Sequence, residues 1–181
     1  ARDVAPLDAA ATQRLDRGDT MVAAALFDEV ERQHPYSPWA RRAQLMSAFS
    51  YYVAKDYNKS VQAAQRFLSI HPGNRDAPYA YYLIGLCYYE QISDVTRDQK
   101  DTTQARTAFT EVIRLYPSTP YARDAKLKLD LVNDHLACTD IEIGLFYDRS
   151  GTCLPSSVRF RTFVAHYHPA PPTPHPLFLL L

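Results

Sequence analysis

The sequence predicts an all-α fold of stacked helical hairpins, and three observations support this. The segments 27–40 and 109–122 are two copies of one pattern, with seven of their fourteen positions identical. Apolar residues along most of the chain recur with the 3.6-residue period of an amphipathic helix. Prolines stand where helices would end, at Pro35, Pro72 and Pro117. Hairpins that repeat in this way bury their apolar faces against one another, so we expect an extended array.

The three prolines set the length of the repeating unit. Pro35 and Pro72 are 37 residues apart, whereas Pro72 and Pro117 are 45 apart, so the third unit carries an insertion of eight residues, at 93–100. The period is close to the helix–turn–helix unit of about 34 residues in tetratricopeptide (TPR) repeats. We therefore expect one TPR-like solenoid over 1–168, with about four to five repeats and the last one incomplete, and a Pro-rich extended tail at 169–181. The expected units are approximately 4–37, 38–74, 75–119 and 120–168.

Five helices follow from the apolar pattern. In the segment 57–70, for example, Tyr57, Val61, Ala64 and Leu68 form one stripe along a helix. Other segments carry two stripes, which indicates neighbours on two sides, as in a stacked array. The expected helices cover 40–53, 57–70, 77–91, 103–116 and 119–136.

Residues typical of helix starts accompany these segments. Ser37 and Thr119 each precede a proline, which predicts an N-cap hydroxyl followed by Pro at the first helical position. Asp76 is expected to cap a helix in a similar way, one residue further from Pro78. The segment 139–142, Thr-Asp-Ile-Glu, matches the capping-box pattern and predicts that a new helix starts there.

Small residues stand where the two helices of each hairpin would cross. A small side chain at a crossing lets two helices approach closely. These positions are Ala23, Ala48, Gly85 and Ala105.

Composition and motifs argue against several functional classes. Lys+Arg and Asp+Glu both total 20, and this zero net charge disfavours general nucleic-acid binding. The chain has no run of 18 apolar residues to span a bilayer. Its three cysteines, Cys87, Cys138 and Cys153, are odd in number and lack Cys-x-x-Cys spacing, which excludes a disulfide framework or a zinc ribbon. No phosphate loop, nucleophile elbow or zincin motif is present. We therefore expect no enzyme activity, no cofactor and no metal.

Tyrosines on the first helices of the units predict a binding surface. The concave face of such an array is lined by these first helices, and tyrosine offers apolar area with a polar tip. By spacing, Tyr52, Tyr81 and Tyr88 are the expected contacts for an extended peptide, with Gln44 and Gln91 holding its backbone. The alternative for each tyrosine is a core position, because consecutive tyrosines on a helix point in different directions.

Several short segments together resemble one known family. They include the sequence 34–37, the tyrosine-rich segments 80–83 and 88–92, the insertion 94–99, and the segments 123–128 and 134–137. In these segments, which lie within roughly 8–165, the chain is similar to the BamD (ComL) lipoproteins, the TPR subunit of the β-barrel assembly machinery (BAM) of the Gram-negative outer membrane.

The resemblance implies a set of partners and a location. Family members bind a POTRA domain of BamA, bind the lipoprotein BamC, and are proposed to receive C-terminal segments of unfolded outer-membrane proteins. They are held at the periplasmic face of the outer membrane by an N-terminal lipid, so a lipid anchor upstream of Ala1 is expected here. The alternative is a different TPR adaptor of the cell envelope.

Four charged residues are the expected docking positions for these partners. By resemblance, Arg159 matches an arginine that docks the POTRA domain, and Arg161 lies on the same expected helix. Arg97 and Asp98 lie in the insertion. Long loops in repeat proteins cluster on one face of the array, so this insertion is expected to form a rim for a partner. The alternative for these four residues is an ordinary solvated surface, on which single charges contribute little.

Overall fold

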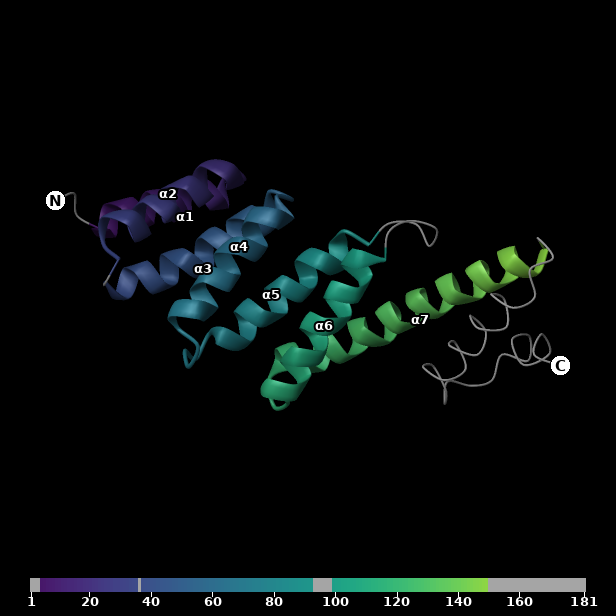
Figure 1. Ribbon diagram of the computed structural model, residues 1–181. Coiled ribbons are helices and arrows are strands. Elements are labelled where there is room, and N and C mark those ends of the chain that lie inside the picture. The colour runs from purple at the N-terminus through teal and green to yellow at the C-terminus, as the bar shows by residue number, and fades with distance from the viewer. Residues whose placement is uncertain (1–3, 36, 93–98, 150–181) are drawn as a thin grey trace.

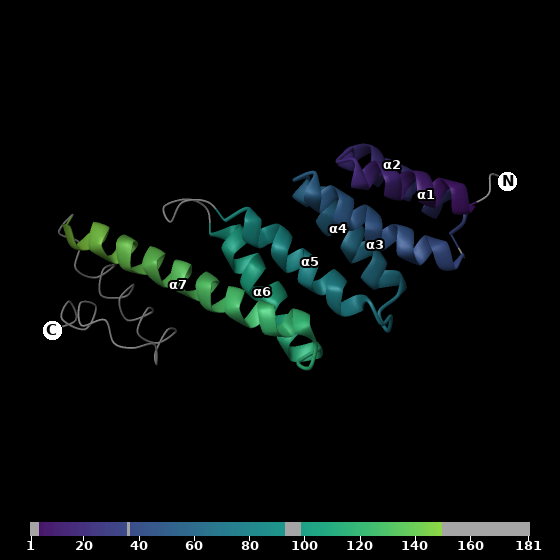
Figure 2. The ribbon, with the colours of Figure 1, turned by 180° about the vertical axis from the view of Figure 1, so that it is seen from behind.

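The computed structural model describes residues 4–35, 37–92 and 99–149, and the secondary-structure elements in these residues are all helices (Figure 1). The predicted all-α class and TPR-like hairpin stacking are confirmed. The helices follow one another from one end of an elongated array to the other, as the view from behind also shows (Figure 2). Their bounds are α1 Val4–Asp16, α2 Thr20–Gln33, α3 Pro38–Val53, α4 Tyr57–Ile70, α5 Ala77–Glu90, α6 Lys100–Leu115 and α7 Pro120–Arg149.

Each helix packs mainly against the helices before and after it in the chain. The pairs α1–α2, α3–α4 and α5–α6 lie inside the first three expected units. Of the fourth unit the structure describes α7, and the tail at 169–181 lies outside the described residues.

The core runs along the array as three clusters of buried side chains. Phe27 anchors the first cluster, between α1, α2 and α3. Leu83 lies in the second, which α3, α4 and α5 share, and Phe109 in the third, which α6 and α7 share with tyrosines of α5. Burying large side chains of this kind contributes about 1.5–3 kcal/mol each. Because each cluster draws on more than one hairpin, a single unit has no complete core of its own.

Close helix approach at Gly85 explains the small residue there. A Cβ atom placed on Gly85 of α5 would lie 2.6 Å from Cε1 of Phe109 on α6, nearer than side-chain atoms normally approach. The other three expected crossing residues are fully buried, as a helix crossing requires: Ala23, Ala48 and Ala105.

Two of the predicted caps are made as expected. The Ser37 hydroxyl oxygen accepts a hydrogen bond from the backbone N–H of Ala40 (3.1 Å), and that of Thr119 accepts one from Ala122 (3.2 Å). Asp76 precedes α5 without a side-chain cap bond. Instead, Asn74 Oδ1 accepts from the backbone N–H of Asp76 (2.8 Å).

The predicted capping box at 139–142 is wrong. The chain passes through this segment as part of α7, a continuous helix of 30 residues. Thr139 donates its hydroxyl hydrogen to the carbonyl oxygen of His135, one turn earlier (3.0 Å). A threonine inside a helix commonly bonds back in this way, so the local pattern alone did not distinguish a helix start from a helix interior. As a result α7 extends well past α6 at the far end of the array (Figure 1).

Candidate functional site

The three tyrosines expected on the binding surface are all half-buried and packed against other rings or the core. Tyr52 stacks at a tilt on Tyr57, with 5.9 Å between ring centroids. Burial, together with the nearby carboxylate of Glu90, raises the pKa of Tyr52. The ring centroids of Tyr81 and Tyr116 are 5.8 Å apart, and Tyr81 lies on the side of α5 that faces α6. Tyr88 contacts both the second and the third core cluster. Peptide binding by these three residues stays a prediction.

The two glutamines expected on the same surface are held by bonds within the fold. Gln44 is only 4% exposed, and its Nε2 donates to Oε1 of Glu31 (2.8 Å). Gln91 follows α5, and its Nε2 donates to the carbonyl oxygen of Cys87 (2.9 Å). The four charged docking residues, Arg97, Asp98, Arg159 and Arg161, lie outside the described residues.

A different group of tyrosines comes together between α5 and α7. Tyr121 of α7 lies 5.6 Å from each of Tyr79 and Tyr82 of α5, measured between ring centroids. The Tyr82 hydroxyl donates to Oδ2 of Asp124, which also accepts from Lys128 (2.9 Å). Burial first, and then this bond, raises the pKa of Tyr82. These contacts join the first helices of the third and fourth units.

The structure also forms a groove that the sequence did not predict, at the start of α3. Its larger part is a cavity of about 650 Å³ between α3, α4 and the α4–α5 connection. Three guanidinium groups and one carboxylate stand around it, from Arg41, Arg42, Arg75 and Asp76. Its apolar lining comes from Pro38, Leu45, Met46 and Phe67.

The arginines of this cavity differ in how they are paired. Arg42 contacts Asp8 of α1 (Nη1 to Oδ2, 3.3 Å), and Arg75 lies 4.0 Å from its neighbour Asp76. Arg41 is exposed and has no carboxylate partner among the residues that the structure describes. It is therefore the cation best placed to accept a new anion.

A second cavity of about 400 Å³ adjoins the first, because Pro38 and Arg41 line both. Glu31, Gln44 and His71 contribute polar groups to it. Its remaining lining is Pro35, Ser37 and Ile70. We call the two cavities together the α3 groove.

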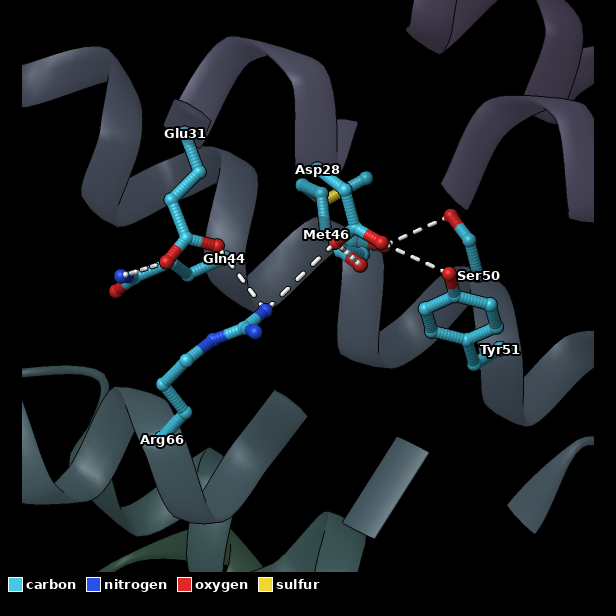
Figure 3. Close-up of polar contacts among 8 residues, drawn as sticks. Asp28, Glu31, Gln44, Met46, Ser50, Tyr51 and Arg66 are labelled. Atoms are coloured by element: carbon cyan, nitrogen blue, oxygen red, sulfur yellow. Dashed lines mark hydrogen bonds and ion pairs between the residues drawn. The ribbon is translucent and has the colours of Figure 1, made fainter. Parts of the chain in front are cut away.

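A polar network joining α2, α3 and α4 supports one wall of the α3 groove (Figure 3). Arg66 of α4 reaches Glu31 of α2 (Nη2 to Oε2, 3.1 Å), and Glu31 in turn accepts from Gln44 of α3. Asp28 of α2 accepts from the hydroxyl of Tyr51 (2.8 Å). Burial and this bond raise the pKa of Tyr51 to about 12. The network fixes how the first two units meet.

The α3 groove combines positive charge with an apolar lining. Guanidinium groups bind carboxylates well, and an adjacent apolar surface takes a hydrophobic side chain. In the described part of the chain, no cluster of three or more His, Cys, Asp or Glu residues is placed to hold a metal ion. The groove is thus suited to a ligand that carries both an anion and apolar groups.

Sequence reasoning missed this groove because its residues are far apart in the chain. The signal available was the Arg41–Arg42 pair near the start of α3 and Arg75 in the turn before α5. Neither pattern is unusual by itself. Only the packing of α3 beside the end of α4 brings the three arginines together.

Comparison with known proteins identifies the family. A family model described as "YfiO: Outer membrane lipoprotein" matches residues 3–181. The chain belongs to this family. The resemblance to the BamD lipoproteins is confirmed by relatives of that name. This YfiO-family chain is 44% identical over 180 residues to the outer membrane protein assembly factor BamD of Caulobacter vibrioides. It is 40% identical over 153 residues to that of Rickettsia prowazekii.

The alignments cover most of this chain but less than two thirds of each of the two relatives. The alignments cover 99% and 84% of this YfiO-family chain, but 59% and 61% of the Caulobacter and Rickettsia proteins. A thermophilic TPR protein of Thermus thermophilus has a similar structure, with a TM-score of 0.51 at 15% identity, covering 98% of this chain and 95% of that one. This likeness shows the TPR fold. None of the helices in the described residues is both long and apolar enough to cross a bilayer.

Proposed function

We propose that this chain is a non-catalytic scaffold lipoprotein of the outer-membrane β-barrel assembly machinery. The family match over residues 3–181 carries this proposal, together with relatives named outer membrane protein assembly factor BamD. A scaffold acts by presenting surfaces to other proteins, and stacked helical hairpins offer extended surfaces of this kind. Its place is the periplasmic face of the outer membrane, held by a lipid anchor upstream of this chain.

The α3 groove is the proposed site for C-terminal segments of unfolded outer-membrane proteins. Such a segment ends in a carboxylate and carries apolar side chains. Arg41 and Arg75 supply the positive charge for the carboxylate, and Leu45, Met46 and Phe67 supply the apolar lining. This match of charge and polarity supports the assignment.

Docking of the folded partners is proposed for the second half of the chain. The partners are a BamA-type POTRA domain and a BamC-type lipoprotein, with contacts from Arg159, Arg161, Arg97 and Asp98. The described part of α7 supports a docking role at this end, because Leu127 and Leu131 are 64% and 56% exposed one turn apart. Contiguous exposed apolar surface often marks a protein interaction site.

A peptide-binding measurement tests the client site. The probe is a synthetic ten-residue peptide of alternating apolar residues that ends in Phe with a free carboxylate, compared with the same peptide ending in a carboxamide. We expect the free acid to bind at least tenfold more tightly, since a charged hydrogen-bonded pair contributes about 1.5–3 kcal/mol. The double variant Arg41→Gln/Arg75→Gln should remove this preference.

Arg123→Gln is the matched control, because Arg123 is an exposed arginine at the start of α7, outside the α3 groove. It should leave both affinities unchanged. Equal binding of acid and amide would contradict the proposed client site.

A pull-down tests the scaffold role separately. Purified chain carrying an affinity tag should retain a POTRA domain, and Leu127→Asp/Leu131→Asp should weaken that retention. Failure of any POTRA domain to bind, with capture of a different envelope protein, would instead support a different TPR adaptor of the cell envelope.

A further inference from the structure

Gln44 carries a buried hydrogen-bond acceptor that has no donor. Its side chain is 4% exposed, and its Oε1 has no hydrogen-bond partner among the described residues. Gln44 also lines the 400 Å³ cavity of the α3 groove. A buried acceptor without a donor is energetically costly, so a donor supplied from the adjoining cavity would stabilise it.

The orientation of this amide is fixed by its neighbours. Glu31 accepts from Nε2 of Gln44 at 2.8 Å, and Arg66 holds Glu31 from the other side at 3.1 Å. Turning the amide over would place its oxygen against the Glu31 carboxylate, and two acceptors in contact repel each other. Figure 3 shows the Gln44 amide nitrogen facing Glu31 and its oxygen facing away from it. The network therefore holds Oε1 as a fixed acceptor.

The surrounding charges favour a neutral N–H group over a cation as the donor. Both oxygens of Glu31 are already bonded, to Gln44 and to Arg66. Arg41 also lines this cavity, and its positive charge opposes the entry of a second cation. A backbone amide has the required donor without a charge, and an extended polypeptide carries one at each non-proline residue.

Arg41 links this acceptor to the anion side of the groove, because it lines both cavities. We propose that Gln44 Oε1 accepts a backbone N–H, directly or through one water, from an extended polypeptide whose terminal carboxylate is bound by Arg41 in the adjoining cavity. Arg66 and Glu31 are then positioning residues that keep the acceptor in place. This proposal rests on the proposed client site and specifies how that site holds the main chain.

A scan of N-methylated peptides tests the proposal. The probe is the ten-residue peptide with a free carboxylate, methylated at one backbone nitrogen at a time over its last five residues. Methylation removes one N–H donor each time and leaves the carboxylate intact. On the wild-type chain, calorimetry should show one position at which methylation weakens binding about tenfold more than at the others.

Two variants separate the acceptor from the rest of the groove. Gln44→Met keeps a similar volume but lacks the acceptor, so binding of the unmethylated peptide should weaken about tenfold and the position-specific effect of methylation should vanish. Arg66→Met keeps the acceptor but releases its orientation, and should reduce the position-specific effect without removing the preference for a free carboxylate. Circular dichroism of both variants should match that of the wild type.

The outcomes are distinct from those of the client-site test. If methylation weakens binding to the wild type equally at all five positions, the Gln44 proposal is overturned. This outcome does not depend on whether Gln44→Met folds. A position-specific effect that persists in Gln44→Met overturns it as well. In either case a retained preference for the free carboxylate leaves the client site standing, whereas loss of that preference in the wild type removes both proposals.

Discussion

Arg66 of α4 and Glu31 of α2 form an ion pair across two units, with 3.1 Å between Nη2 and Oε2. Both helices pack against α3, which lies between them in the chain. The pair therefore joins the second helix of the first unit directly to the second helix of the second unit. Asp28 lies 3.8 Å from the same guanidinium nitrogen, so a single arginine connects two carboxylates.

Removing this cation should loosen the junction between the first two units. We expect Arg66→Met to lower the free energy of unfolding by about 1 kcal/mol, the upper end for partly exposed ion pairs, because two carboxylates lose their partner. Arg114→Met is the control, since Arg114 pairs with Glu111 within α6 alone. Urea unfolding should show a smaller loss for the control, and equal losses would contradict a junction role.

Adding one methyl group at Gly85 should destabilise the α5–α6 hairpin. The new Cβ would lie 2.6 Å from Cε1 of the buried Phe109 ring, so the helices must separate or the ring must move. We expect Gly85→Ala to cost about 1–3 kcal/mol, as overpacking of a core does. Gly73→Ala, with no atom within 4 Å of the added Cβ, should change the free energy by less than about 0.5 kcal/mol. Thermal unfolding that ranks the two variants the other way would refute the close crossing.

The Asp124 carboxylate should make stability depend on pH on the acid side. Hydrogen bonds from Tyr82 and then Lys128 lower its pKa below the usual 3.8. A lowered folded-state pKa stabilises the fold above the unfolded value, and this contribution is lost as pH falls through the folded value. Asp124→Asn should therefore melt below the wild type at pH 7, with the difference shrinking as the pH falls below the usual aspartate pKa of 3.8.

Asp130→Asn, an exposed change on the same helix, is the control for that experiment. Its melting temperature should stay close to that of the wild type across the same pH range. A constant difference between wild type and Asp124→Asn from pH 7 to pH 2 would argue against the ionised bond.

Two cysteines should differ sharply in reactivity. Cys87 is fully buried and donates to the Ser60 hydroxyl oxygen (3.2 Å), and burial raises its pKa to about 11. Cys138 is exposed on α7. Since the thiolate is the reactive form, iodoacetamide at pH 8 should label Cys138 and spare Cys87 until the chain is unfolded. Peptide mass spectrometry reports both sites, and early labelling of Cys87 would show that the second core cluster opens.

Local patterns predicted most of the helical fold. The expected segment 57–70 coincides with α4, and 40–53 differs from α3 by two residues at its start. The misplaced capping box in α7 shows the limit of such patterns. Whether Thr139 starts a helix or continues one depends on the hydrogen bonds of the preceding turn, which a four-residue motif does not specify.

The amino-acid sequence by itself determined the helices, the repeat and the family, because each depends on residues that are neighbours in the chain or recur at a fixed period. The tertiary structure alone decided where polar groups meet. The α3 groove takes Glu31 from α2, Arg41 from α3, and His71 and Arg75 from the connection between α4 and α5, and it leaves Gln44 with an unpaired oxygen. Contacts between such distant residues depend on how helices pack in space, which the period of a sequence does not encode.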